Sequence, residues 1–322
     1  MIIFIGPNRQ RRNIKKFGNC EQAPTYKHRT YNWLFRTRRL PGATYIFTFI
    51  DRLDPSERRL AGKIYRHINQ LGAGFKALND PTCVKNRYQL LRALFQAGVN
   101  DFDVYPAAES PHPKRFPVFI RRISQSLPPL TDLVTDQANL DRIISELEAA
   151  GEPLDDLMVI EFCAAEIAPG IFQKYSAYRA GDQVSLNYTI FESNWQVKIG
   201  QIDIVDPVFY DKEAEDLEQN AYAEIARQVF DIAQIEYGRA DFGLVDGRPQ
   251  FYEINFNPEF RTTESTSKVP QRKKNVARAV ERRFKDVAAL DRPATQSQPN
   301  ISNPELTAFR WRFWRNYAPQ RY

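Results

Sequence analysis

The sequence predicts a mixed α/β fold divided into about two domains. Its 322 residues are enough for two domains of roughly 150 residues each. Short strand patterns alternate with helical patterns in the first hundred residues. A stretch with four prolines, 106–117 (PAAESPHPKRFP), then precedes a second series of strands and helices. The apolar share of 43% is slightly below the roughly 45–50% of globular proteins, but the local periodicity still permits a packed core.

The first predicted domain covers residues 1–110. MIIFIG at the start is typical of a short buried strand, residues 45–50 (YIFTFI) of a second one, and the stretch between them looks basic, polar and irregular. Apolar residues recur at helical spacing over 60–71 and again over 84–95, and a glycine follows each segment. This alternation predicts a small α/β domain with a basic N-terminal segment.

The second predicted domain covers residues 116–290. Its predicted elements are strands over 117–121 and 157–163, a helix ending near Gly151, a hairpin of 172–179 and 183–191, one longer helix with Leu217, Ala221, Ile225, Val229 and Ile232 on one face, a second hairpin over 238–258, and a basic helix over about 272–288. Residues 291–322 are predicted to be a Pro/Ser/Gln-rich linker and a basic-aromatic tail (RWRFWR).

Charge is unevenly distributed along the chain, whose net charge is +6. The first fifty residues contain ten Lys/Arg and a single acidic residue, Glu21. Such a segment suits an anionic partner, namely a phosphorylated substrate, nucleic acid or an anionic surface, and it is equally typical of a solvated basic face. The tail could stack on bases or lie at a membrane interface, but we expect it to pack back on the body.

Cysteine and histidine usage argues against several classes of protein. Three cysteines without CxxC spacing do not suit a disulfide framework or a structural zinc site, and three histidines make a histidine-based metal site a poor candidate. The first strand is too short for a signal-peptide core, and no apolar run approaches about 18 residues. We therefore expect a cytoplasmic protein without a transmembrane segment.

Residues 238–258 (GRADFGLVDGRPQFYEINFNP) predict a hairpin that carries oxygen ligands. A three-residue loop over 245–247, with its glycine in the left-handed region, would place Arg239 opposite Glu253 and Asp241 opposite Phe251. Both carboxylates and Asn255 would then share one face. A two-residue loop would separate Asp241 from Glu253 and abolish the site.

Carboxylate and amide oxygens on one face suit Mg²⁺, which keeps further positions for water and phosphate oxygens. Arg239 on the same face could bind a phosphate or an oxyanion with two hydrogen bonds. The alternative is a salt-bridged sheet surface, in which Arg239 pairs with Glu253.

Arg-x-Asp, followed after about a dozen residues by Glu-Ile-Asn-x-Asn-Pro, resembles the metal-binding end of the ATP-grasp superfamily, closest to its D-alanine–D-alanine ligase-like and glutathione synthetase-like branches. The resemblance implies two α+β lobes, about 116–160 and 161–290, that sandwich the nucleotide behind a small Rossmann-like domain. It implies that Asp241, Glu253 and Asn255 hold two Mg²⁺ ions, with Mn²⁺ as an alternative, against the phosphates of ATP. Arg239 would be the catalytic residue that assists the transferred phosphoryl group.

The same resemblance implies a nucleotide site. The implied ATP-binding residues are Arg87, Arg121 in place of a lysine, the interlobe hinge Glu161, Phe162 and Cys163, Glu166 at the ribose, and the strand lysines Lys174 and Lys198. Arginine binds phosphate but does not simply replace lysine, and exposed strand lysines are also ordinary surface residues. The loop 123–130 (ISQSLPPL) departs from the family because it lacks glycine, and its two prolines remove backbone donors. It would have to use the side chains of Ser124, Gln125 and Ser126, or bind phosphate weakly.

The resemblance implies an ATP- and Mg²⁺-dependent carboxylate–amine ligase that forms an acyl phosphate from small-molecule acids and joins them to amines. The first alternative is a degenerate ATP-grasp-like protein that binds a nucleotide or an acidic ligand without turnover. The second alternative, a nucleic-acid or anionic-surface binder, would rest on the basic N-terminus and the tail. Nucleic acid is not expected as a partner, because that alternative leaves the hairpin unexplained; a homodimer is left open.

Overall fold

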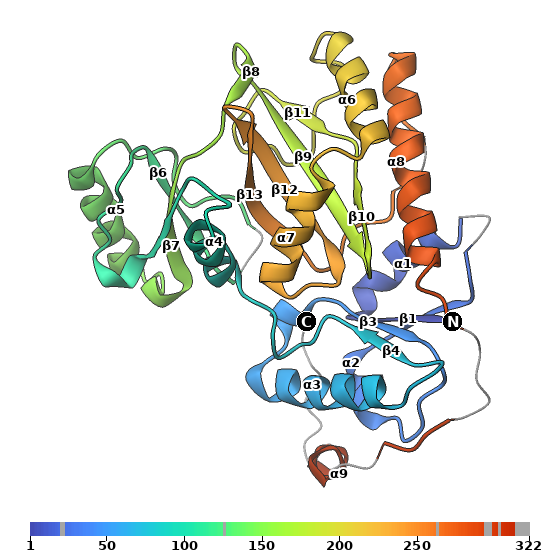
Figure 1. Ribbon diagram of the computed structural model, residues 1–322. Helices are drawn as coiled ribbons and strands as arrows, with labels where there is room; N and C mark the ends of the chain where they lie inside the picture. The colour runs from blue at the N-terminus through green and yellow to red at the C-terminus, as the bar shows by residue number, and fades with distance from the viewer. Residues whose placement is uncertain (20–22, 125–126, 262–263, 293–297, 302–303, 313–322) are drawn as a thin grey trace.

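The computed structural model describes residues 1–19, 23–124, 127–261, 264–292, 298–301 and 304–312. It has the predicted mixed α/β architecture, organised around three sheets. In Figure 1 a parallel sheet lies at the bottom, a large antiparallel sheet stands above it, and a small third sheet lies at the left.

The N-terminal sheet is parallel, with strand order β2-β1-β3-β4. Its elements are β1 (Ile2–Ile5), α1 (Arg11–Phe17), β2 (Tyr26–Arg29), α2 (Tyr31–Arg36), β3 (Thr44–Phe47), α3 (Pro55–Gln70) and β4 (Lys76–Leu78). The segment between β1 and β3 was predicted to be irregular, and that prediction is wrong. It forms two helices and an edge strand because Ile14, Phe17, Leu34 and Phe35 are buried in the core.

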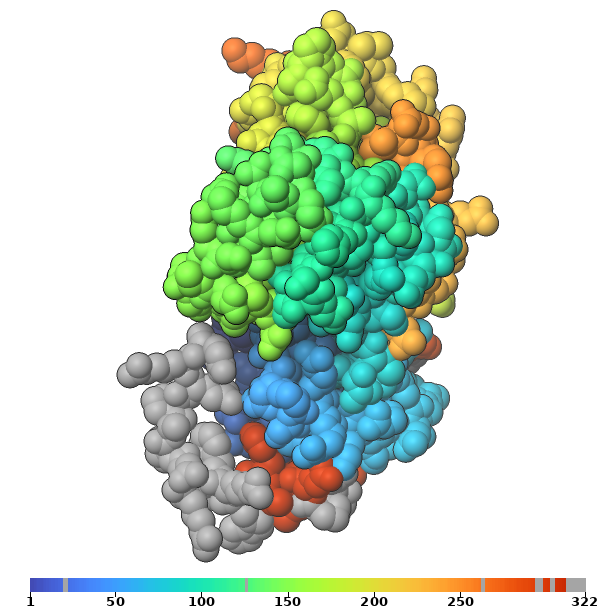
Figure 2. Space-filling model, turned by 90° about the vertical axis from the view of Figure 1, so that its left-hand side faces the viewer, coloured from blue at the N-terminus to red at the C-terminus, as the bar shows by residue number. Residues whose placement is uncertain are grey.

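A three-stranded antiparallel sheet forms the small lobe, with strand order β5-β7-β6. Its elements are β5 (Val104–Pro106), β6 (Val118–Arg122), α5 (Gln137–Ala149) and β7 (Leu157–Glu161), and α4 (Arg87–Gln96) precedes them in the chain. Figure 2 shows this part of the molecule, in green, above the blue N-terminal domain. Strand β5 falls inside the predicted first domain (1–110) but pairs with β7 of the small lobe. The predicted domain boundaries stay a prediction.

The third sheet is antiparallel and forms the large lobe. Its elements are β8 (Glu166–Ala168), β9 (Ile171–Ala180), β10 (Gln183–Leu186), β11 (Ile190–Glu192), α6 (Val208–Gln219), α7 (Ala223–Ala233), β12 (Tyr237–Val245), β13 (Arg248–Asn255) and α8 (Pro270–Ala288). The predicted single helix through 217–232 is wrong, because Asn220 and Tyr222 adopt left-handed backbone angles (φ 52° and 63°) and divide it. The Asn220 side chain instead bonds the backbone of β10, accepting from Leu186 N (2.8 Å) and donating to Val184 O (2.9 Å).

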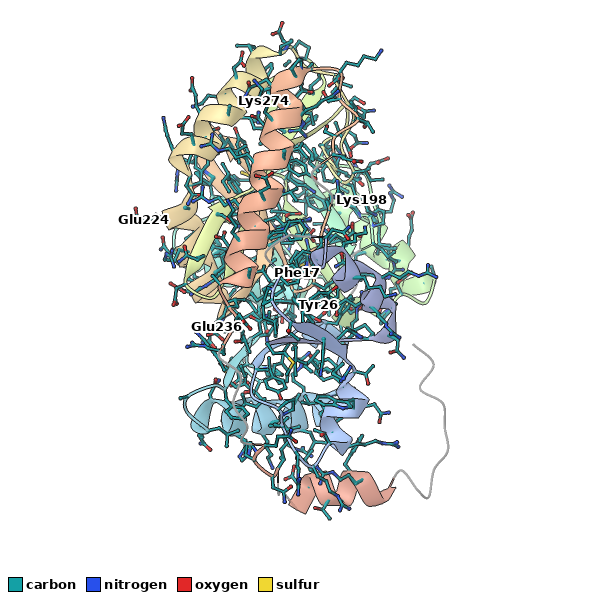
Figure 3. The ribbon with its side chains drawn as sticks, turned by 90° about the vertical axis from the view of Figure 1, so that its right-hand side faces the viewer. Phe17, Tyr26, Lys198, Glu224, Glu236 and Lys274 are labelled. Carbon is teal, nitrogen blue, oxygen red and sulfur yellow. The ribbon has the colours of Figure 1, made fainter. Side chains whose placement is uncertain are left out.

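A buried asparagine joins the parallel sheet to the large lobe. Asn79, just after β4, donates through Nδ2 to Phe47 O (3.0 Å) and Tyr237 O (2.8 Å). Its Oδ1 accepts from the backbone N–H groups of Glu236 (2.8 Å) and Tyr237 (2.9 Å). Glu236, labelled in Figure 3, lies between α8 and the parallel sheet, directly before β12. The start of the strand that carries Arg239 and Asp241 is therefore fixed to the N-terminal domain.

Helix α9 (Pro304–Arg312) packs back on the N-terminal domain. The ring of Phe309 lies edge-on to that of Phe35 of α2, with the ring centroids 5.2 Å apart. Arg310 donates to the carbonyl oxygens of Phe35 (3.1 Å) and Thr37 (2.6 Å). Arg310, the first residue of the basic-aromatic tail, therefore contacts the N-terminal domain. The side chains of residues 311 and 312 and all of residues 313–322 lie outside the described part, so packing of the tail on the body stays a prediction. Within the described ranges, we find no helix with the length and apolar character needed to cross a bilayer.

Candidate nucleotide and metal site

The turn of the β12–β13 hairpin has two residues. Val245 pairs with Arg248, and both Asp246 (φ 50°) and Gly247 (φ 77°) adopt the left-handed angles of a type I′ turn. The predicted three-residue loop is therefore wrong.

A β-bulge nevertheless brings the two carboxylates together. Phe242 pairs with Phe251, but the register then shifts by one residue, so that Asp241 pairs with Glu253 and Arg239 with Asn255. The extra residue is Tyr252. The predicted partners were wrong, yet Asp241 and Glu253 do share a face, because the bulge compensates for the shorter turn.

Packing on both sides of the strand explains this register. Phe242 and Phe251 pack against each other in the core, with ring centroids 4.8 Å apart. Asn100 continues the ladder at the edge of β13, donating to Phe251 O and accepting from Phe251 N, each at 2.8 Å. Phe251 is thereby held toward the core, and the bulge turns Glu253 to the opposite face.

Most of the predicted site residues line one pocket between the small and large lobes. The predicted residues in its lining are Arg121, Glu161, Phe162, Cys163, Lys174, Lys198, Asp241 and Glu253. The lining comes from α4, residue 102, β6, residues 127–129, the end of β7 and the segment after it, β9, residues 195–198 and the hairpin. The fold therefore gathers these side chains from both lobes around one space.

Asp241 is buried and paired with cations. Arg239 donates to its two carboxylate oxygens through Nε (2.6 Å) and an Nη (2.8 Å), and Lys174 Nζ lies 3.5 Å from it. The Asp241 side chain is only 1% exposed, so this pairing offsets the cost of burying its charge.

Glu253 lies among cations that come from different elements. An Nη of Arg87, the first residue of α4, lies 2.5 Å from its carboxylate. Burial disfavours the charged form, but the charges of Arg87, Arg121, Lys174 and Arg239 outweigh it and lower the pKa of Glu253 to about 2. Glu253 is therefore an ionised ligand candidate at neutral pH.

The donor set at the hairpin fits a hard cation. Asn255 Nδ2 lies 3.5 Å from a Glu253 oxygen, so the amide is next to that carboxylate. The described residues contain no group of three or more His, Cys, Asp or Glu that could hold a metal. Two carboxylates and an amide are the ligands Mg²⁺ prefers.

Arg121 extends from β6 of the small lobe into the pocket. One Nη donates to Leu127 O (3.2 Å), whereas Nε is buried without a hydrogen-bond partner in the described structure. Burial, with the nearby charge of Arg87, lowers the pKa of Arg121 to about 10. A buried cation with a free donor suits an anionic ligand.

The carboxylate of Glu161, at the end of β7, is taken up by hydrogen bonds within the protein. The Glu161 carboxylate accepts from Asp103 N (3.0 Å), Tyr105 Oη (2.9 Å) and Lys114 N (3.0 Å), which ties the proline-rich segment to β7.

Glu166 accepts from Gly170 N (3.0 Å) within the β8–β9 turn and is absent from the pocket lining that the structure describes. The structure thus does not bring Glu166 to the other predicted residues.

The glycine-free loop lies at the pocket. Ser124 Oγ donates to Asp156 (2.6 Å) and so engages the segment before β7. Gln125 and Ser126 lie outside the described residues, while Leu127, Pro128 and Pro129 line the pocket. The described part of this loop therefore offers apolar surface rather than a row of backbone donors.

Trp195 and Tyr252 are two of the aromatic pocket residues that were not predicted. The ring of Trp195 lies 4.9 Å from that of Phe119 and 5.5 Å from that of Phe162, so it contacts both the small lobe and the hinge. Tyr252 donates its hydroxyl to Cys163 O (2.9 Å). A tryptophan in the polar stretch ESNWQVK, beside Lys198, was a signal for the first. The position of Tyr252 in the pocket depends on the β-bulge, which the sequence does not reveal.

Comparison with solved structures identifies the fold. Two structures of the ATP-grasp ligase PsnB, one complexed with a minimal precursor and one with a phosphomimetic variant of that precursor, Mg and ADP, match at a TM-score of 0.51 and 11% identity. Each match covers 90% of this chain; it covers 98% of the PsnB chain in the first structure and 96% in the second. D-alanine–D-alanine ligase from Bacillus anthracis, complexed with ATP, matches at a TM-score of 0.45 and 14% identity over 89% of this chain and 97% of the ligase.

No protein-family model matches the sequence, and neither does any curated protein. The likeness to PsnB shows that the chain has the ATP-grasp fold, as its hairpin motif predicted.

Proposed function

We propose that the protein is an ATP- and Mg²⁺-dependent carboxylate–amine ligase that acts through an acyl phosphate. The observation that carries this proposal is the pairing of Asp241 with Glu253 across the bulge, on a pocket that also receives Arg121, Lys174 and Lys198. The solved ATP-grasp ligases of the same fold support it.

The cations around the pocket suit a triphosphate. Arg121, Lys174 and Lys198 would bind phosphate oxygens, and Arg87 would join them once Glu253 engages a metal ion. Asp241, Glu253 and Asn255 would hold Mg²⁺, which neutralises phosphate charge when bound. The backbone of 161–163 would bind the base.

Arg239 would stabilise the phosphoryl group during transfer. Its guanidinium donates to both oxygens of Asp241, so its donors would turn to the phosphoryl group once Asp241 engages the metal ion. A carboxylate oxygen of the acid substrate attacks the γ-phosphorus of ATP, the bond from that phosphorus to the β–γ bridging oxygen breaks, and ADP leaves. The amine then attacks the acyl carbon, phosphate departs, and the nitrogen loses a proton. No protein side chain forms a covalent bond, since positioning and electrostatics carry such transfers.

A second candidate function is binding of a nucleotide or an acidic ligand without turnover. Pro128 and Pro129 favour it, because they line the pocket where backbone donors would otherwise contact phosphate.

ADP formation distinguishes the two functions. The assay would use a panel of carboxylic acids and amines with ATP, with and without Mg²⁺, on wild type, Glu253→Gln and the exposed control Glu224→Gln. Mg²⁺-dependent ADP release that is lost only in Glu253→Gln supports the ligase. ATP binding with no ADP for any pair supports the second function, and equal ADP release by all three proteins contradicts the proposed role of the hairpin.

A further inference from the structure

The bulged residue of the hairpin contacts the segment that follows β7. Tyr252 Oη lies 2.9 Å from Cys163 O and donates a hydrogen bond to it. Its ring packs beside Phe102, with centroids 6.2 Å apart. Both Tyr252 and Cys163 line the pocket, so this bond joins two of its walls.

The opposite strand leaves room for that hydroxyl. A Cβ at Gly243 would lie 2.5 Å from Tyr252 Oη and 3.3 Å from two carbons of its ring. A side chain at position 243 would therefore displace the tyrosine hydroxyl. Burial also raises the pKa of Tyr252, which keeps its hydroxyl protonated at neutral pH.

Tyr252 and Glu253 are consecutive residues of one strand. Glu253 faces the cations that suit a triphosphate, while Tyr252 holds the hinge backbone. A single rigid element thus sets the distance between the phosphate side and the base side of the pocket. Without the bulge, regular alternation would turn these neighbours to opposite faces of the sheet.

We propose that Tyr252 is a positioning residue for the nucleotide base: its hydroxyl fixes Cys163 and its neighbours at the place where their backbone meets the base. This inference rests on the proposed function, since it needs ATP in the pocket. It assigns Tyr252 to recognition of the base, whereas Arg121 and Lys174 act on the phosphates.

Calorimetric titration of the full chain tests this assignment with two probes, MgATP and magnesium tripolyphosphate, which has no base or ribose. The variants are Tyr252→Phe, which removes only the hydroxyl, and Gly243→Ala, which displaces it. Tyr45→Phe is the matched control, because the Tyr45 hydroxyl also donates to a backbone carbonyl, Pro41 O at 2.7 Å, in the N-terminal domain.

We expect Tyr252→Phe and Gly243→Ala to bind MgATP about tenfold more weakly, because a tenfold loss corresponds to one well-placed hydrogen bond. Their affinity for tripolyphosphate should equal that of wild type. Tyr45→Phe should bind both probes like wild type. Wild-type affinity for MgATP in Tyr252→Phe overturns the inference alone, as does an equal loss for both probes, which would indicate a general structural role. A wild-type protein that binds neither probe overturns the proposed function and this inference with it.

Discussion

Asp241 lies directly opposite Glu253 across the β12–β13 hairpin, because Tyr252 is bulged out of β13. The two carboxylates have different ion-pair partners. Asp241 is held by Arg239 and Lys174, whereas Glu253 is held by Arg87. Each carboxylate therefore has a cationic partner, and a metal ion bound by both carboxylates would have to compete with these ion pairs.

Asn79→Ala should destabilise the whole protein. The change removes four hydrogen bonds of a fully buried side chain and leaves backbone groups of Phe47, Glu236 and Tyr237 without partners. We expect a loss of about 3 kcal/mol in the free energy of unfolding, measured by urea denaturation. Asn32→Ala, on the exposed face of α2, should change it by less than about 0.5 kcal/mol. Similar values for the two variants would contradict the role of Asn79 as the joint between the domains.

The free energy of unfolding should depend on pH through Glu253. Its folded pKa of about 2 is below the ordinary value of 4.5, so its stabilising contribution is complete above about pH 4.5 and is lost as the pH falls toward 2. The stability difference between wild type and Glu253→Gln should therefore shrink over that interval. A difference that stays constant from about pH 6 to pH 2 would show that Arg87 and its neighbours do not hold this carboxylate ionised.

Trp195 should report occupancy of the pocket. Its ring lines the pocket and contacts Phe119 and Phe162, so a base entering there changes its surroundings. Addition of ATP should change tryptophan emission in wild type and in Trp33→Phe but not in Trp195→Phe. If the change persists in Trp195→Phe, the base binds elsewhere.

The sequence predicts much of the fold, because its evidence is local. Alternation and turn residues locate the hairpin, and the motif Arg-x-Asp with Glu-Ile-Asn indicates the ATP-grasp fold. The bulge, in contrast, depends on contacts between residues that are distant in the sequence. It depends on Asn100, which bonds Phe251 from a segment about 150 residues away in the chain, and on Phe242 in the core.

The helix break has a similar cause. Apolar spacing continues smoothly from Leu217 to Ile232, and only the bonds of Asn220 to β10 reveal that the helix ends there. Glu166 could not be placed from sequence either, since the tight β8–β9 turn takes its carboxylate.

Calorimetric titration of ATP into wild type and Glu253→Gln, with and without Mg²⁺, tests the central claim most directly. The account predicts Mg²⁺-dependent binding in wild type that is lost or loses its Mg²⁺ dependence in Glu253→Gln, because Asp241 and Asn255 alone make a poor Mg²⁺ site. Unchanged Mg²⁺-dependent binding in the variant would contradict the assignment of the hairpin as the metal site, and no binding in wild type would show that this pocket does not serve ATP.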